Sequence, residues 1–407
     1  MNFIDRMTVI KEYSEGRTTF LCADIEHYSR DQGLATSDLP VFYNKRMQLN
    51  RDISVLFLSA YMKKNPIDLM CEPLTGSGVR TLRYLNECPG EFRAEMFDVN
   101  PLAVEMVQKN IELLSLEKRA LVKRGDAKVL LMTESRGKRF DYVDVDPFGS
   151  PAPYLNAAIQ SLNPRGAMLA LTATDMPALC GVYPRVALRK YGGSSIRAPF
   201  SHEIAVRLLV GLTYSVAGMN DRSISPLAAL STDHYIRVWF GIKADRITSN
   251  RQADSMGFMR YCPNCMHTES VSLRAISPGP GFQHQRENCD GKVRGAGPLW
   301  IANIYDCEFL NIAGEMLPDY EDSFHKRVPR LLDLMKKECG LMKHAYVDLH
   351  ELCDLHNLVP PKTAAVMEEL RNMGYRVSQT HFRPTAIRTN SPVSKVVHTI
   401  RKLTGAG

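Results

Sequence analysis

The sequence has 407 residues, more than one hydrophobic core usually serves, so we expect two domains or one large domain with an appendage. Hydrophobic residues make up 44% and charged residues 23% of the chain, which excludes a disordered or collagen-like protein. The 51 Lys and Arg exceed the 44 Asp and Glu, and the formal net charge of +7 permits an anionic partner. The sequence has no secretory signal and no run of about 18 apolar residues, so we expect a cytoplasmic protein without a membrane span.

Strands and helices alternate through the first 250 residues. This alternation implies right-handed crossovers and a mainly parallel twisted sheet flanked by helices, an α/β, Rossmann-like domain with its ligand at the carboxyl ends of the strands. In chain order, the hydrophobic pattern predicts a helix at 46–61, a strand at 67–71, a helix at 78–87, a strand at 95–99, a helix at 101–114, strands at 120–124, 142–145 and 167–173, a helix at 202–217 and a strand at 235–242.

A polar stretch from Arg246 to Gly257 marks a change of composition. We therefore predict a catalytic domain at residues 1–250 and a smaller α+β domain at 251–407. The second domain divides into a cysteine-containing segment at 251–310 and a helical, winged-helix-like part at 311–407. Its last 32 residues contain no Asp or Glu and are expected to form a solvated tail or an anion-binding surface; their basic residues are Arg376, Arg383, Arg388, Lys395, Arg401 and Lys402.

A glycine-containing turn follows the first strand of this alternation. Gly76 and Gly78 allow a tight turn and a close ligand, and Asp98, at the end of the next strand, suits the hydroxyls of a ribose. Asp126, after the third strand, is placed to meet the edge of a base. A nicotinamide dinucleotide site would have a third glycine where this chain has Thr81, so S-adenosylmethionine fits better. The alternatives are a plain turn and an Asp98 that caps the following helix.

The fourth strand ends in Asp146-Pro147-Phe148-Gly149. An acid, a proline and an aromatic residue at this place are typical of methyltransferases that modify exocyclic amino groups. Asp146 and the carbonyl of Pro147 can accept hydrogens of such an amine, and Asp146 can take its proton. Phe148 can stack on the base. The structural alternative is a tight turn with a buried aromatic ring.

Several segments resemble the tRNA (guanine-26 N2)-dimethyltransferases, and the archaeal members of that family most. The resemblance spans nearly the whole chain and is carried by Glu15-Gly16-Arg17, VFYNKRMQLNRD (41–52), DVDPFGSP (144–151), AGPLW (296–300) and GYRVSQTHFRP (374–384). It implies a class I methyltransferase domain that transfers two methyl groups in succession from S-adenosylmethionine to N2 of guanosine 26. It also implies that the C-terminal half contacts the tRNA by phosphate neutralisation.

Carried over to this sequence, the resemblance implies Asp146 as the catalytic residue. The implied cofactor contacts are Arg51, Arg80, Asp98, Asp126 and Ala127, and we add Gly76 and Gly78 of the glycine turn. A guanidinium clamps a carboxylate well, so Arg51 and Arg80 suit the cofactor carboxylate, although either could instead be a surface arginine of a helix. The substrate contacts that we expect are Phe42, Asn44 and Phe148.

The ten cysteines are expected to be core thiols or metal ligands rather than disulfides, as in most cytoplasmic proteins. Some members of the family have two Cys-x-x-Cys pairs before AGPLW, a zinc-binding spacing. In this chain Cys262 and Cys265 form the first pair, but only Cys289 remains of the second. Zinc then requires His284 as fourth ligand, or His267 in its place. A metal-free knuckle packed on the core is the alternative.

Two other functions are compatible with the motifs. One is an amino-group methyltransferase that acts on ribosomal RNA or on DNA, and the other is a tRNA-binding protein without catalytic activity. The segment 41–52 argues against the first, and the presence of Asp98, Asp146 and both glycines argues against the second. We expect tRNA as partner and a monomeric protein.

Overall fold

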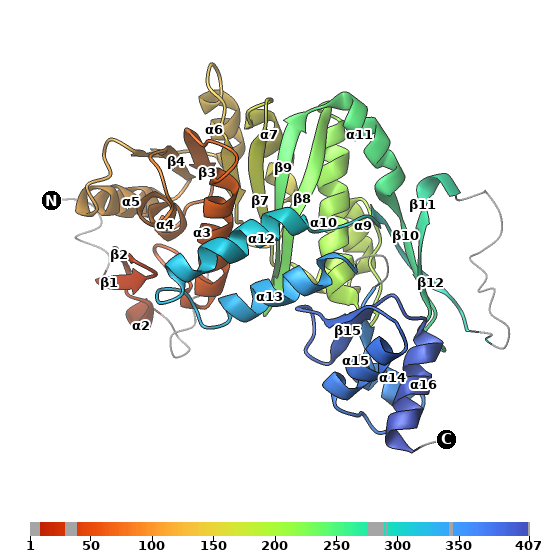
Figure 1. Cartoon of the computed structure of the whole chain (residues 1–407). Coiled ribbons are helices and arrows are strands. Elements are labelled where there is room, and N and C mark those ends of the chain that lie inside the picture. Colours follow the sequence, from red (N-terminus) through yellow and green to blue (C-terminus); the bar gives the residue numbers. More distant parts are fainter. Residues whose placement is uncertain (1–8, 29–38, 276–288, 290, 342–344, 406–407) are drawn as a thin grey trace.

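The computed structural model describes residues 9–28, 39–275, 289, 291–341 and 345–405. A seven-stranded sheet forms the centre of the molecule, in the order β5-β4-β3-β6-β7-β9-β8 (Figure 1). Strands β3 to β7 run parallel, and β9 lies antiparallel between β7 and β8. The strands are β3 (Leu69–Glu72), β4 (Arg93–Asp98), β5 (Ala120–Arg124), β6 (Tyr142–Val145), β7 (Ala167–Ala173), β8 (Arg222–Thr232) and β9 (Tyr235–Ala244).

The strand order reverses between β3 and β6, because the chain leaves β3 towards β4 and β5 and then returns to the other side of β3. Ligands of α/β sheets bind at such a switch point, beyond the carboxyl ends of the strands. The glycine turn follows β3 and the Asp146 motif follows β6, so both lie at this point. The predicted Rossmann-like, mainly parallel sheet is confirmed.

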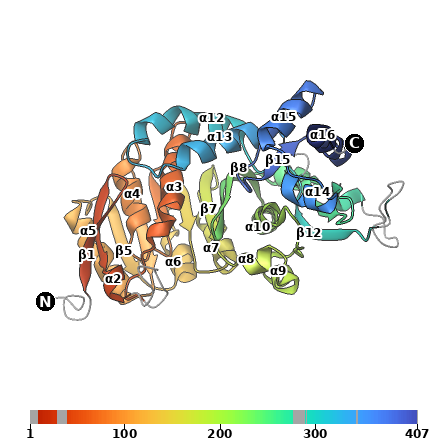
Figure 2. The same ribbon diagram turned by 90° about the horizontal axis from the view of Figure 1, so that it is seen from below.

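Helices cover both faces of the sheet (Figure 2). One face carries α3 and α4 together with α12 and α13 from the second half of the chain, and the other carries α6, α7 and α10. The helices of this region are α3 (Gln48–Met62), α4 (Val79–Glu87), α5 (Pro101–Leu113), α6 (Ala127–Glu134), α7 (Ala152–Ser161), α8 (Met176–Leu179), α9 (Pro184–Tyr191), α10 (Ser201–Gly218), α11 (Arg246–Gln252), α12 (Cys307–Met316) and α13 (Val328–Cys339).

A hairpin of β1 (Ile10–Glu15) and β2 (Thr18–Ala23), followed by α2 (Ile25–Tyr28), packs on α4 and α5. Its turn contains Gly16 at φ +59°, and a Cβ there would overlap the side chains of Arg83 and Glu87. The sequence pattern did not predict this hairpin. It brings Glu15 into the core, where the residue is 3% exposed and its carboxylate pairs with arginines of α3 and α4.

The second half of the chain contains two small sheets. The first has the order β11-β10-β12 and lies against α10, and the second has the order β13-β15-β14. The helix-helix-strand-strand order of the last part is that of a winged helix, which stays a prediction. The elements are β10 (Met256–Tyr261), β11 (Thr268–Ser272), β12 (Arg294–Trp300), β13 (Val347–Asp348), α14 (Leu349–Leu355), α15 (Thr363–Asn372), β14 (Val377–Gln379), β15 (Ala386–Thr389) and α16 (Val393–Thr404).

Contacts cross the predicted boundary at residue 250. Helix α12 packs on α3 and on β8, and β12 packs on α10. Arg388 of β15 is fully buried and pairs with Glu203 of α10 and with Glu338 of α13, both at 3.0 Å. The division into 1–250 and 251–407 stays a prediction, and these contacts tie the two parts together.

The basic C-terminal stretch is not a solvated tail. Besides the buried Arg388, Arg383 pairs with Asp348 at 2.7 Å and Lys402 pairs with Glu369 at 2.5 Å. Residues Val393–Thr404 form α16, which packs on α15. The sequence pattern misled because the carboxylates that pair with Arg383, Arg388 and Lys402 lie elsewhere in the chain.

Cys307 and Cys339 form a disulfide that joins α12 to α13. The expectation of thiols is therefore wrong for this pair, whose members are 32 residues apart and come together only in the folded chain. The other eight cysteines, all within the described residues, form no disulfide. In the part of the chain that the structure describes, no helix combines the length and the apolar character needed to cross a membrane.

Candidate active site

The glycine turn after β3 requires glycine at two positions. Gly76 and Gly78 have φ of +54° and +78°, and Gly78 precedes α4 as its N-cap residue. A Cβ on Gly78 would lie 2.9 Å from Cγ2 of Val107, and one on Gly76 would lie 3.1 Å from the carbonyl oxygen of Phe42. The turn is thus packed between α5 and the segment that contains Phe42, which fixes its backbone for a ligand.

Asp98 binds this turn directly. Its Oδ2 accepts a hydrogen bond from the Gly76 amide at 2.8 Å, and its Oδ1 accepts one from the Asn100 amide at 2.9 Å. Asn100, not Asp98, caps α5, since its Oδ1 accepts from the Leu102 amide. The alternative of Asp98 as helix cap is therefore wrong, and its carboxylate lies beside the glycine turn, where a ribose would be expected.

Asp126 caps α6. Its Oδ1 accepts hydrogen bonds from the amides of Lys128 and Val129, at 2.9 and 3.1 Å. The residue is exposed and Ala127 next to it is buried. These capping hydrogen bonds use Oδ1 and leave Oδ2 available for the edge of a base. This contact of Asp126 stays a prediction.

Asp146 follows β6 and pairs with Arg80 of α4. The contact joins Nη2 of Arg80 to Oδ2 of Asp146, while Nη1 donates to Oδ1 of Asn50 at 2.8 Å. Arg80 is 3% exposed. Burial disfavours its charged form, but the carboxylates of Asp146 and Asp144 outweigh burial and raise its pKa well above the usual value. Arg80 thus stays a cation and fixes the Asp146 carboxylate at the sheet edge.

Glu72 is a buried acid at the same edge to which the sequence pattern gave no role. It is 3% exposed, accepts hydrogen bonds from Thr81 and Thr75 at 2.6 and 3.1 Å, and lies 3.6 Å from Nε of Arg80. Burial raises its pKa to about 7, against the opposing effect of Arg80. The position of Glu72 at the end of β3, before the glycine turn, could have indicated a role at the site. Its burial could not be predicted from the sequence.

Phe148 is 68% exposed, so the alternative of a buried aromatic turn is wrong. Its ring meets that of Phe42 edge to face, with centroids 4.5 Å apart. Pro147 beside it is buried. Two hydrogen bonds hold the loop: the Gly149 amide donates to Oγ1 of Thr174, and the Thr174 amide donates to the Gly149 carbonyl. The structure thus brings Asp146, Phe148 and Phe42 together at one edge.

Arg51 lies in a different arrangement. Its guanidinium makes two hydrogen bonds of 2.6 Å to the Glu15 carboxylate and a third to the Asn44 carbonyl. Burial favours a protonated Glu15, but Arg51 and Arg83 outweigh it and lower its pKa to about 2. The side chain of Asn44 caps the short 3-10 helix Lys45–Met47. Arg51 and Arg80 are both buried, so the alternative of surface arginines is wrong. Both are engaged by carboxylates of the protein, and their role towards a cofactor carboxylate stays a prediction.

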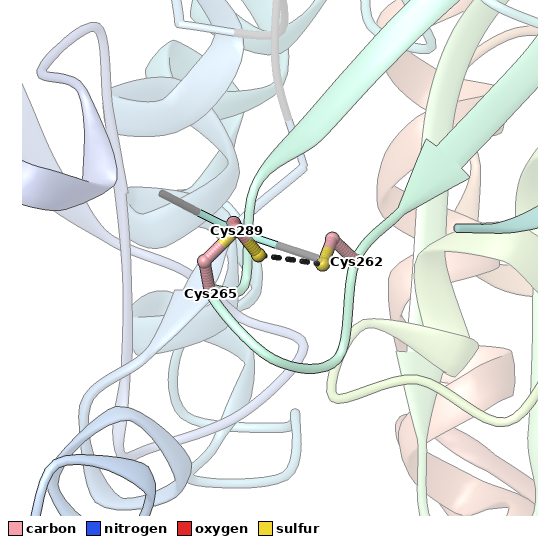
Figure 3. Close-up of side chains that lie close together, drawn as sticks. All are labelled: Cys262, Cys265 and Cys289. Carbon is pink, nitrogen blue, oxygen red and sulfur yellow. Dashed lines mark hydrogen bonds between the residues drawn. The ribbon is translucent and has the colours of Figure 1, made fainter. Parts of the chain in front are cut away.

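Three cysteines converge after β10 (Figure 3). The sulfur atoms of Cys262, Cys265 and Cys289 lie within 4.8 Å of one another, and those of Cys262 and Cys289 are 3.7 Å apart. Zinc–thiolate bonds of about 2.3 Å in a tetrahedron put two sulfurs about 3.8 Å apart, so the cluster fits zinc. His284 lies outside the described residues. The backbone carbonyl of His267 accepts a hydrogen bond from the Cys262 amide, which closes the turn.

Comparison with known proteins shows the family of the chain. The family model of the N2,N2-dimethylguanosine tRNA methyltransferases matches residues 16–401. The chain belongs to this family. A tRNA (guanine(26)-N(2))-dimethyltransferase of Methanosphaera stadtmanae is 36% identical over 88% of this chain and 90% of its own length. The enzyme of the same name from Methanothermobacter thermautotrophicus is 34% identical over 88% and 91%.

A solved structure supports the same assignment. Trm1 from Pyrococcus horikoshii, in complex with S-adenosyl-L-methionine, superposes with a TM-score of 0.80 at 27% identity, over 96% of this chain and 99% of that one. The resemblance inferred from the motifs is thereby confirmed, and so is the class I methyltransferase fold. The roles of individual side chains in this member of the family remain proposals.

Proposed function

We propose that this protein transfers two methyl groups in succession from S-adenosyl-L-methionine to the exocyclic N2 of guanosine 26 in tRNA. The observation that carries the proposal is the sheet edge at which the Asp146 carboxylate and the exposed Phe148 ring lie beside the glycine turn. The names of the relatives supply the tRNA, the position and the base, and the Pyrococcus structure supplies the cofactor.

The chemistry of the amine explains the acid at this place. The N2 lone pair of guanine is delocalised into the ring, so the nitrogen is a poor nucleophile until acceptors draw its hydrogens out of conjugation. The bound cofactor supplies an electrophilic methyl group on sulfur. Asp146 and the Pro147 carbonyl accept the two N–H groups, and Asp146 takes the proton that the nitrogen loses once it is alkylated.

Arg80 prepares Asp146 for this task. It holds Oδ2, and in the described residues no hydrogen bond occupies Oδ1, which is therefore available to the guanine amine. The side chain of Asp146 is 19% exposed, enough to meet a base that enters from solvent. A fixed carboxylate costs little reorganisation when the amine arrives, which is how a preorganised group lowers a barrier.

Phe42 and Phe148 receive the base. Guanosine in a folded tRNA must first leave its stack, at a cost of about a few kcal/mol, and stacking on an aromatic ring recovers about 1–3 kcal/mol. The exposed Phe148 offers such a ring, and Phe42 supports it edge-on. For a second transfer, the pocket must also accept the monomethylated guanine.

Substitution of Asp146 by Asn tests the assignment. The amide keeps the shape of the side chain but cannot take a proton, so we expect methyl transfer to fall by at least about a hundredfold, the usual contribution of a general base. Binding of S-adenosylmethionine, followed by calorimetry, should stay within about threefold of the wild-type value. The exposed Asp354→Asn serves as control. Loss of cofactor binding with D146N, or full turnover, would contradict the role given to Asp146.

We further propose that Cys262, Cys265 and Cys289, with His284 as fourth ligand, hold a structural zinc ion. The spacing of the three sulfur atoms supports this proposal. The ion would tie β10 to the chain before β12 and would take no part in methyl transfer, which needs no metal. We also propose that the protein acts as a monomer and in the cytoplasm, where a tRNA substrate is met.

A further inference from the structure

The segment between β7 and α10 presents an unusual surface beside the catalytic loop. Residues 176–201 contain no Asp or Glu, and include α8 and α9. We call five exposed side chains of this segment the α9 surface: Tyr183, Arg185, Leu188, Arg189 and Arg197. Tyr183 is 58% and Leu188 52% exposed. Large exposed side chains on a basic surface are what a protein offers to a partner of opposite charge.

Within the described residues, the three arginines of the α9 surface have no ion-pair partner. In the described part of the chain, none of Arg185, Arg189 and Arg197 makes an ion pair or a side-chain hydrogen bond. Lys190, one residue further, differs because it pairs with Asp175 at 3.2 Å. The arginines are therefore free to neutralise an external anion. In the C-terminal stretch, by contrast, Arg383 and Arg388 are occupied by carboxylates.

The α9 surface is fixed to the loop that carries Phe148. Strand β7, which ends before Thr174, lies next to β6, and Thr174 makes two hydrogen bonds to Gly149 of the loop. The hydroxyl of Tyr191, at the end of α9, donates to Asp175 at 2.5 Å. Both α8 and α9 rest on α10 (Figure 2). The segment that carries the α9 surface is therefore anchored to the catalytic loop through Thr174 and Asp175.

We propose that the α9 surface docks the backbone of the tRNA next to the target guanosine, and that Tyr183 stacks on a neighbouring unpaired nucleotide. This inference rests on the proposed function and adds to it a docking site within the catalytic half of the chain. Guanidinium groups bind phosphates in a fork geometry, and tyrosine is a usual stacking platform for unpaired RNA bases. A nucleic acid can bind the charged arginines through its phosphates and the aromatic ring through a base. The place of the surface beside the catalytic loop suits a substrate whose target base enters that loop.

The test compares two triple variants with the same change of net charge. The first is R185Q/R189Q/R197Q. The second, R93Q/R136Q/R165Q, removes three exposed arginines near the amino ends of the parallel strands, at the opposite edge of the sheet from Phe148. Each is assayed for KM of an unmodified tRNA transcript, for kcat, for cofactor affinity, and for the dependence of the tRNA dissociation constant on salt.

We expect the first variant to raise the KM for tRNA by at least about tenfold and to reduce the slope of log K against log salt by about 2, since each phosphate contact contributes about 0.7 on single strands. Cofactor affinity should not change, and R185K/R189K/R197K should restore the slope. Tyr183→Ala should raise KM without changing the slope, and Tyr183→Phe should behave as wild type. The control triple should leave KM and slope within about twofold of wild type.

Equal effects of the two triple variants, or an unchanged tRNA KM in the α9 variant, would overturn the proposal and leave the surface to another partner. A wild-type protein that does not methylate tRNA at all would instead refute the proposed function. The two failures are thus distinguishable. All substituted arginines are exposed, and the melting temperature of each variant confirms that it is folded.

Discussion

Arg80 is the residue on which the charges of the site converge. Three carboxylates surround its buried guanidinium: Asp146 after β6, Glu72 at the end of β3 and Asp144 within β6. Asp144 is in turn held by Arg237 at 2.6 Å. One buried cation cannot fully stabilise the ionised forms of several buried acids, so one of these acids is stabilised less than the others. Glu72 is that acid, and its pKa of about 7 follows from burial that Arg80 does not fully offset.

Glu72 makes stability depend on pH. Its folded-state pKa of about 7 lies above the ordinary 4.5, so its contribution is fully present below pH 4.5 and is lost as the pH rises towards 7. A shift of this size corresponds to roughly 3 kcal/mol. The free energy of unfolding of E72Q, relative to wild type, should therefore rise by up to that amount between pH 5 and pH 8. Urea unfolding at several pH values measures it.

The exposed Glu112→Gln on α5 is the control for this experiment and should show no such trend. A constant difference between E72Q and wild type across the range would mean that Glu72 is ionised in the folded protein throughout.

At the residue scale, the site residues that belong to sequence motifs could be predicted, but the residues with which they form hydrogen bonds and ion pairs could not. Asp146, Phe148 and the two glycines could be found because they follow strands at fixed intervals. The pairing of Arg51 with Glu15 could not, because 36 residues separate the two and the hairpin that carries Glu15 was not predicted. The burial of Glu72 and of Arg388 likewise depends on segments distant in sequence.

At the scale of elements, hydrophobic periodicity located the buried strands most accurately. The bounds of β5, β6 and β7 agree with the predicted 120–124, 142–145 and 167–173. Strand β8 was missed because Pro226 and small residues interrupt its pattern, and the chain shifts register there. Helix α9 was missed because it is short and polar, and it is held in place by the contact of Tyr191 with Asp175.

The cysteine segment yields a prediction at this scale. Protein purified without a histidine tag should contain about one zinc per chain, measured by atomic emission, because three thiolates and one imidazole complete a tetrahedral site. C289S should lose the metal, whereas C180S, which changes a cysteine outside the cluster, should keep it.

H284A and H267A then identify the fourth ligand. The proposal expects the zinc content to fall in H284A and to stay in H267A. A zinc content near zero in the wild-type protein would establish the metal-free knuckle instead.

At the scale of the whole molecule, the second half of the chain completes the first. Helices α12 and α13 cover one face of the central sheet, and the buried pairs of Arg388 join β15 to α10 and α13. Removal of residues 251–407 would therefore expose core surface and leave Glu203 with one cationic partner fewer. For this reason tRNA contacts are better tested by substitutions on the surface of the full chain than by truncation.

The whole molecule also places the Phe148 ring, the Asp146 carboxylate and the segment of the α9 surface beyond the carboxyl ends of β6 and β7. All three features can contribute to the same reaction only if the methyl acceptor is a base of a structured RNA. The central claim thus concerns which nucleoside acquires the methyl groups and where it lies in the substrate.

Mass spectrometry of nucleosides from a tRNA transcript that has reacted with the protein and S-adenosylmethionine tests this claim most directly. We expect N2,N2-dimethylguanosine to accumulate, with N2-methylguanosine before it, and both to be absent when guanosine 26 is replaced by adenosine. Undiminished methylation of the substituted transcript, or a methylated nucleoside other than these two, would contradict the account.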